Sequence, residues 1–346
     1  MEQETNTSPD SERAADWHIP VLLEPILEHA RQVCEQKSAP LLVDGTLGDG
    51  GHCMALLRAL PGARYIGFDQ DAHMLERAGR RLMAAGLAVR APIRATDRIA
   101  LPEPGGVQLV HGRFDSISTC LSVSNLAADW VLLDLGVSMF HFRSAGRGFS
   151  YTDEKLDMRL DFARNETAAQ WLNSANQTEI ERVIREYGEE RFAGRIARRI
   201  CEHRPLESAR QLADIVRRVY PPGQRLHPAT RTFQAIRIHI NDEMSVLQKA
   251  LGSIPDILAV NGALAVISFH SLEDRPVKQV FRQLAGPRQH RNKYGREEQE
   301  SRSERRPFEI LTPAPILPDA AECGRNPAAR SAKLRILRRL IDNNNT

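Results

Sequence analysis

The 346-residue chain lacks several features that would place it in a specialised class of protein. It has no apolar run near the roughly 20 residues that a membrane-spanning helix needs, so we expect no membrane association. Its five cysteines are scattered and form no C-x-x-C pair, which argues against a disulfide framework or a zinc site and fits a reducing cytoplasm. The eleven histidines show no ligand spacing, so no metal site is expected.

The sequence also has no internal repeat and no targeting signal that we can identify. Segment 1–16 is polar and acidic, unlike a secretory signal or a transit peptide, and we expect it to be disordered. The net charge of +3 conceals an uneven distribution: residues 1–140 carry 12 basic and 18 acidic side chains, and residues 275–346 carry 16 and 8. Residues 190–240 hold 11 arginines against 4 acids. This asymmetry indicates a ligand-binding part joined to surfaces for a polyanion, although solvated arginine-rich helices would give the same counts.

Short apolar segments that suit buried strands alternate with segments of helical periodicity. The expected strands are Leu41–Val43, Tyr65–Phe68, Val107–Val110, Trp130–Leu133 and Ala263–Phe269. Strands that are apolar throughout predict a parallel sheet covered on both faces by helices. The proline-bearing interval 88–106 predicts an irregular loop, and the charged interval 287–309 a mobile one. Residues 331–340 are a last strand candidate, with a helix as the alternative.

Between residues 167 and 220 the periodicity is helical and no strand candidate occurs. A single long helix is expected over 229–251. We therefore predict a sheet domain made of residues 17–140 and 245–346, interrupted by an all-helical insertion at 141–244.

The most informative stretch is the glycine-rich turn Asp44–His52, which follows the first strand and precedes a helix. Such a turn lets backbone N–H groups approach a ligand closely. Its spacing is not the G-x-G-x-x-G of dinucleotide folds, and its acids disfavour a pyrophosphate. Asp69 ends the next strand, where a nucleotide fold places a carboxylate on ribose hydroxyls. The stretch predicts a site for a cationic nucleoside such as S-adenosylmethionine; the alternative is an ordinary strand–helix turn.

Polar side chains at later strand ends extend this hypothesis, because ligands of doubly wound sheets sit there. Phe114 could cover an adenine face, and Asp134 could hold the amino-acid end of the cofactor or orient a nucleophile. Strand-end polar residues also commonly cap helices, so each signal alone is weak. The segment Asp134–Ser138 departs from the Asn/Asp-Pro-Pro-aromatic loop of many amino methyltransferases, so it does not by itself identify one.

Seven blocks of the chain closely resemble one family, the bacterial 16S ribosomal RNA cytosine-N4 methyltransferases (the RsmH or MraW family). The blocks are Asp44–His52, Asp134–Ser138, Arg147–Ser150, Leu156–Arg159, Tyr187–Arg191, His227–Arg237 and Ser268–Arg275. They occur in order between about residues 18 and 339. The resemblance implies a doubly wound, Rossmann-like class I methyltransferase sheet with an inserted all-helical domain that recognises RNA. It implies S-adenosylmethionine-dependent N4-methylation of a cytidine in the decoding centre (P-site region) of 16S rRNA, with the small ribosomal subunit as partner, a cytoplasmic location and a possible homodimer.

The resemblance also implies roles for individual residues. Cofactor contacts fall on Gly50, Gly51, His52, Asp69, Phe114, Asp134 and His141, the last in place of the family's usual Gln. Catalytic candidates are Asp134 and His270. Contacts to the substrate RNA fall on Arg231, Arg237, Ser268, Phe269, Ser271 and Glu273.

Each assignment has a structural alternative. His52 and Ser271 could cap helices, His270 could be a satisfied structural histidine, and Arg237 could pair with Glu243. The C-terminal arginines 335, 338 and 339 could meet phosphates or be solvated. Two other functions stay open: an RNA-binding assembly protein with a vestigial cofactor site, and a small-molecule methyltransferase.

Overall fold

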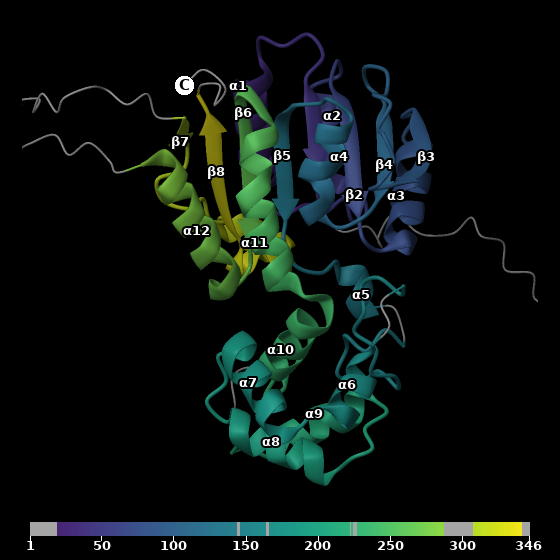
Figure 1. Cartoon of the computed structure of the whole chain (residues 1–346), viewed down its shortest axis with the longest axis vertical. Helices are drawn as coiled ribbons and strands as arrows, with labels where there is room; N and C mark the ends of the chain where they lie inside the picture. The colour runs from purple at the N-terminus through teal and green to yellow at the C-terminus, as the bar shows by residue number, and fades with distance from the viewer. Residues whose placement is uncertain are drawn as a thin grey trace, which may run out of the picture.

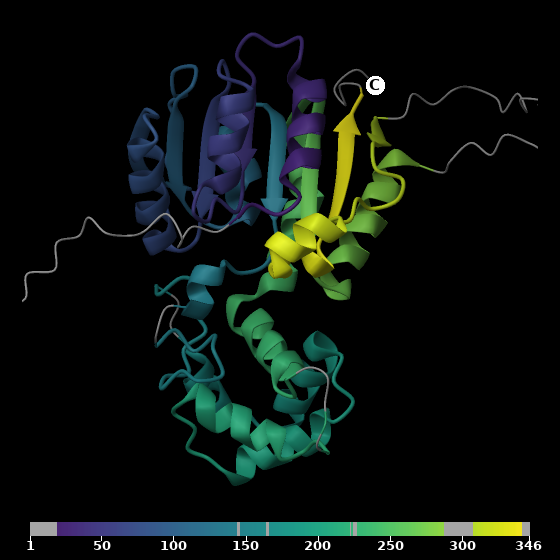
Figure 2. The ribbon, with the colours of Figure 1, turned by 180° about the vertical axis from the view of Figure 1, so that it is seen from behind.

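The computed structural model describes residues 19–143, 146–163, 166–221, 223, 227–286 and 307–340. Segment 1–16 and most of the interval 287–309 lie outside the described residues, so the expectations for them are not tested. Figures 1 and 2 show a sheet with helices on both faces, and a group of helices beyond one end of that sheet. Within the described ranges, no helix is long and apolar enough to cross a membrane.

The sheet has eight strands in the order β3-β4-β2-β1-β5-β6-β8-β7. The strands are β1 (Leu41–Asp44), β2 (Arg64–Asp69), β3 (Val89–Arg94), β4 (Val107–His111), β5 (Ala128–Asp134), β6 (Leu258–Ser268), β7 (Phe308–Ile310) and β8 (Lys333–Arg339). Neighbours from β3 to β6 pair in parallel, whereas β8 is antiparallel to both β6 and β7. The chain starts at β1 and builds outward in both directions, so the strand order reverses between β1 and β5, where such sheets bind ligands.

Helices cover both faces of the sheet because successive strand residues point to opposite sides. Leu42 belongs to the core under α1 (Leu23–Cys34), α2 (Gly51–Ala59) and α3 (Ala72–Ala84). The adjacent Val43 belongs to the core under α4 (Ile117–Val123), α11 (Glu243–Ser253) and α12 (Ser271–Ala285). This confirms the doubly wound α/β architecture expected from the sequence.

A third apolar core holds the helical part together. Its helices are α6 (Ala168–Ser174), α7 (Gln177–Gly188), α8 (Ala193–Glu202), α9 (Ala209–Arg217) and α10 (Thr230–Asn241). Capping boxes at Thr167 and Ser208 begin α6 and α9, and Asn176 caps α7. The short α5 (Met139–Arg143) and the α10–α11 junction connect this part to the sheet (Figure 1).

The structure corrects two of the expected elements. The interval 88–106 contains β3, an edge strand whose exposed Arg90, Ala91 and Pro92 present no apolar run, and an edge tolerates proline. The helix expected over 229–251 is two helices, because Asp242 adopts a left-handed backbone conformation (φ 55°) that ends α10. Of the interval 287–309 the structure describes residues 307–309, and β7 begins at Phe308. The C-terminal segment forms strand β8, not the alternative helix.

Candidate functional site

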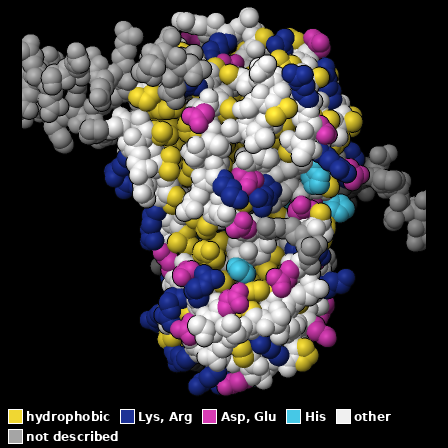
Figure 3. All heavy atoms as spheres, in the orientation of Figure 1, with side chains coloured by type: hydrophobic (Ala, Val, Ile, Leu, Met, Phe, Trp, Pro, Cys, Tyr) yellow, Lys and Arg dark blue, Asp and Glu magenta, His cyan; other side chains and the backbone are white. Residues whose placement is uncertain are grey.

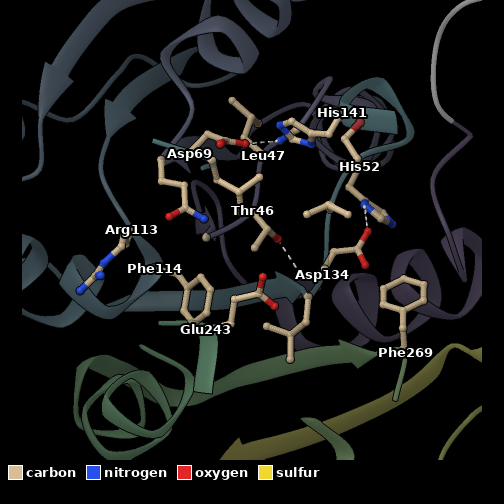
Figure 4. Close-up of a pocket in the computed structure, with 18 of the residues that line it drawn as sticks. Thr46, Leu47, His52, Asp69, Arg113, Phe114, Asp134, His141, Glu243 and Phe269 are labelled. Carbon is tan, nitrogen blue, oxygen red and sulfur yellow. Dashed lines mark hydrogen bonds and ion pairs between the residues drawn. The ribbon is translucent and has the colours of Figure 1, made fainter. Parts of the chain in front are cut away.

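A pocket opens at the carboxyl ends of β1, β2, β5 and β6, on the side of the sheet that meets the helical part (Figure 4). Its lining includes Gly45, Thr46, Leu47, Gly48, Asp49, Gly51, His52, Asp69, Gln70, Arg113, Phe114, Asp134, His141, Glu243, Met244, Leu247, Phe269 and Glu273. The cofactor residues expected from the sequence all line it, except Gly50, which begins α2 with φ 73°.

Buried side chains below the glycine turn hold its backbone in one conformation. The buried Asp44 carboxylate accepts hydrogen bonds from the Thr46 backbone N–H and the Tyr65 hydroxyl, each at 2.9 Å. Burial raises the pKa of Asp44 to about 6. A Cβ at Gly45 would lie 2.4 Å from a Leu133 methyl and 2.8 Å from the Phe114 Cβ, so only glycine fits there. The turn therefore keeps its backbone close to the ligand space.

Asp69 ties the second strand to this turn. Its Oδ2 accepts from the Gly48 N–H and its Oδ1 from the Asp71 N–H, both at 2.9 Å. Burial raises the pKa of Asp69 to about 6, partly offset by these two hydrogen bonds. Each carboxylate oxygen can accept a further bond, so Asp69 can still receive ribose hydroxyls.

Asp134 has unfilled hydrogen-bonding capacity in the pocket. Its backbone N–H donates to the Thr46 hydroxyl at 2.7 Å, and its Oδ2 lies 3.8 Å from His52 Nδ1. Its Oδ1 is buried and has no hydrogen-bond partner among the residues that the structure describes. Burial, with the charges of Asp44 and Glu273, raises the pKa of Asp134 well above its ordinary value. A donor from a bound ligand would satisfy this atom.

The pocket is acidic and has aromatic walls. Carboxylates of Asp49, Asp69, Asp134, Glu243 and Glu273 line it, and its arginine, at position 113, pairs with the neighbouring acid at position 115. In Figure 4, Asp134 lies between the rings at positions 114 and 269. The chemistry fits a cationic ligand with a flat base, as S-adenosylmethionine has, and the unpartnered Asp134 oxygen gives that ligand a place to donate.

His141 borders the pocket with one nitrogen already engaged. Its Nε2 lies 3.0 Å from Asp71 Oδ2, and Arg147 donates to the same oxygen at 2.9 Å. Although burial opposes the effect, His141 and Arg147 together lower the pKa of Asp71. Only His141 Nδ1, which is buried and unpartnered within the described residues, is left to reach a ligand.

The expected RNA contacts are only partly gathered at the pocket. Phe269 and Glu273 line it. Two others are internal: Ser268 is 2% exposed within the sheet, and Arg237 forms two 2.9 Å hydrogen bonds with Glu243.

His270, expected as a catalytic candidate, is not among the lining residues. Its Nε2 lies 3.1 Å from Glu273 Oε1, and Glu273 Oε2 accepts from the Phe269 N–H at 2.7 Å. Although burial opposes it, the hydrogen bond and charge of His270 lower the pKa of Glu273. Its Nδ1 is buried and has no hydrogen-bond partner within the described residues, so His270 is not a fully satisfied structural histidine.

Two of the three C-terminal arginines are also internal. Arg335 pairs with Asp274 through bonds of 2.7 and 3.2 Å, and Arg339 donates to the Asp256 carbonyl at 3.0 Å. Arg338 pairs with Glu309. Burial therefore contradicts a phosphate-binding role for Arg335 and Arg339.

Sequence reasoning assigned no role to several pocket residues. Thr46 lies within the glycine turn, which is the sequence signal that could have singled it out. Its hydroxyl accepts a hydrogen bond from the Asp134 backbone N–H at the end of β5. Glu243, Met244 and Leu247 reach the pocket only because the chain breaks at Asp242 and redirects α11. No local sequence pattern predicts that change of direction.

Residues 15–340 match the model described as the MraW methylase family. Relatives named "Ribosomal RNA small subunit methyltransferase H" include those of Persephonella marina (38% identical, 93% of this chain and 99% of that protein) and Thermobifida fusca (41%, 94% and 94%). That of Nitrosomonas europaea is 40% identical over 93% of this chain and 97% of its own. A solved rRNA methylase from Streptococcus thermophilus aligns over 94% of this chain and 100% of its own, at 11% identity and a TM-score of 0.40.

Proposed function

Because the chain belongs to the MraW methylase family and is an S-adenosylmethionine-dependent methyltransferase, we propose that it methylates N4 of a cytidine in the decoding centre of 16S rRNA. The names of the relatives support the RNA of the small ribosomal subunit as the substrate. The proposal places the reaction on the small subunit in the cytoplasm. One observation supports an amine as the group that accepts the methyl: Asp134 Oδ1 is buried and has no hydrogen-bond partner within the described residues.

In this proposal Asp134 receives a hydrogen bond from the exocyclic amine of the target base. When bound, S-adenosylmethionine would supply the methyl group from its sulfonium, leaving the neutral thioether, and the methylated amine nitrogen would release a proton. Asp134 orients the nitrogen lone pair toward that methyl group, which is most of what the reaction requires. The raised pKa of Asp134 also makes this carboxylate a better acceptor for the departing proton.

The target base must leave its stack to reach this depth. Phe269 lines the pocket beside Asp134 and offers a ring on which the base can stack (Figure 4). The helical insertion, residues 141–244, would grip the RNA. Figure 3 shows dark blue Lys and Arg side chains on the lower, helical part of the visible face, interspersed with magenta acidic ones. Helix α8 carries three exposed arginines, Arg195, Arg198 and Arg199.

Asp134 could instead hold the ammonium group of the cofactor, and one substitution separates the two roles. For Asp134→Asn, an acceptor-orienting role predicts a fall in single-turnover methylation of about 10²–10⁴-fold with cofactor affinity changed less than about tenfold. Calorimetric titration with S-adenosylmethionine measures the affinity. A loss of cofactor binding as large as the loss of rate would assign Asp134 to the cofactor.

The substrate itself is tested with small subunits from a strain that lacks the gene. Incubation with purified protein and labelled S-adenosylmethionine, followed by mass mapping of 16S rRNA, is expected to show one new N4-methylated cytidine in the decoding centre. Methyl transfer to another base would refute the proposal. Cofactor binding with RNA binding but no transfer would favour the assembly-protein alternative.

A further inference from the structure

Glu189 forms a bridge between the helical part and the sheet part of the molecule. It follows α7 with a left-handed backbone conformation (φ 46°). Its Oε2 accepts a 3.0 Å hydrogen bond from the Ser271 hydroxyl, and its Oε1 lies 2.9 Å from Arg275 Nη2. Arg231 donates to the backbone carbonyl of the same residue at 3.1 Å. The Glu189 carboxylate thus contacts a hydroxyl and one guanidinium group, and a second arginine binds the backbone carbonyl of the same residue.

This bridge is accessible to solvent, unlike the other carboxylate–arginine contacts near the pocket. The Glu189 side chain is 46% exposed and that of Arg275 is 66% exposed. By contrast, the side chains of the Arg237–Glu243 pair are 13% and 19% exposed. The hydrogen bond from Ser271, with the charges of Arg275 and Arg231, holds the pKa of Glu189 below its usual range. An exposed ion pair contributes little stability and exchanges readily for another anion.

The bridge lies at the edge of the pocket. Ser271 is the first residue of α12, and its chain neighbours Phe269 and Glu273, two residues to either side, both line the pocket. An anion held by Ser271 is therefore next to a base that enters the pocket. A carboxylate and a phosphate present similar acceptor oxygens to a hydroxyl and to guanidinium groups.

We propose that Ser271, Arg275 and Arg231 form a phosphate-binding subsite for the RNA backbone beside the target nucleotide, and that Glu189 occupies it until RNA displaces the carboxylate. This inference rests on the proposed function, since it needs RNA as the substrate. It assigns Glu189 the role of an internal competitor and adds Arg275 to the expected contacts. Because the Glu189 carboxylate occupies the subsite, a single small anion binds there weakly. An oligonucleotide, which makes several phosphate contacts at once, can displace the carboxylate.

The test compares two substitutions that remove the same charge from the same region. Glu189→Gln removes the competitor. Glu186→Gln is the matched control, because Glu186 is an exposed acid on α7 that pairs with Arg182 at 2.9 Å, away from Ser271. Binding of a labelled 16S rRNA fragment is measured by fluorescence anisotropy over a range of salt concentrations.

Glu189→Gln is expected to tighten RNA binding about three- to tenfold, because the phosphate no longer has to displace a carboxylate. The slope of log K against log salt should change little, because both proteins make the same phosphate contact. Glu186→Gln should change affinity less than twofold. Arg275→Ala should weaken binding and, combined with Glu189→Gln, should abolish the gain. Together these results would support the subsite.

Equal affinities for the two Gln variants would overturn the inference, as would weaker binding by Glu189→Gln. A fall in kcat with unchanged RNA affinity would make Glu189 a structural clasp between the two parts and would also overturn it. These failures differ from failure of the proposed function, which would appear as a wild-type protein that does not methylate 16S rRNA at all.

Discussion

Arg237 and Glu243 stand on either side of the helix break at Asp242, and their side chains form two parallel 2.9 Å hydrogen bonds. Arg237 belongs to α10 in the helical part, and Glu243 begins α11 on the sheet. The pair therefore fixes the junction that sets α10 against α11, and it keeps the Glu243 carboxylate at the pocket wall.

Loss of this pair should destabilise the protein. Arg237→Ala leaves a largely buried carboxylate without its partner, and we expect the free energy of unfolding to fall by about 3 kcal/mol. Urea unfolding followed by circular dichroism measures the change. Arg182→Ala, which breaks the exposed pair with Glu186, is the control and should cost less than about 1 kcal/mol. Similar losses for both variants would show that the junction does not depend on the pair.

The role of Asp69 can be measured directly on the cofactor. Asp69→Ala should weaken S-adenosylmethionine binding by roughly 1–3 kcal/mol, the cost of a lost charge-assisted hydrogen bond. Asp69→Asn has one acceptor oxygen and can keep only one of the hydrogen bonds from the Gly48 and Asp71 backbone N–H groups, so it removes the charge with a smaller loss of support for the turn than Asp69→Ala. Unchanged affinity in both variants, measured by calorimetry, would remove Asp69 from the cofactor site.

The buried Asp44 predicts a specific pH dependence of stability. Burial raises its pKa from 3.8 to about 6, so the folded protein binds this proton more tightly than the unfolded chain. Its contribution to stability is therefore fully present below about pH 4 and is lost as the pH rises to about 6. Relative to Asp44→Asn, the wild-type protein should lose about 3 kcal/mol across this window. Parallel curves of unfolding free energy against pH for the two proteins would refute the assignment.

Gly45 is expected to tolerate no side chain. Gly45→Ala places a Cβ under 3.0 Å from Leu133 and Phe114, and this overpacking should cost about 1–3 kcal/mol and displace the Phe114 ring. Weaker cofactor binding should accompany the lower stability. Gly252→Ala is the control, because no atom lies within 4 Å of that Cβ in α11, and it should stabilise by about 0.5–1 kcal/mol. A Gly45→Ala protein as stable as wild type would contradict the close packing.

The strands that could be read from the sequence were those buried on both faces. Leu41–Val43 and Trp130–Leu133 are apolar throughout because helices cover both sides, so their pattern is complete in the sequence. The edge strand β3 has one neighbour and exposed residues, so its composition does not differ from that of a loop. The break at Asp242 was missed because aspartate in a left-handed conformation has no distinctive sequence pattern.

The sequence by itself determined the glycine turn and the acids at the ends of β1, β2 and β5, and hence the edge of the sheet at which the pocket lies. These depend on short-range geometry, in which a strand, a turn and a helix are consecutive in the chain. Only the tertiary structure decided which polar side chains are available to a ligand. Arg237 and Ser268 became internal, Asp134 Oδ1 was left buried without a partner, and Glu189 was brought to Ser271 across 82 positions of sequence. Pairing between distant charges is set by how whole elements pack, and local sequence carries no record of it.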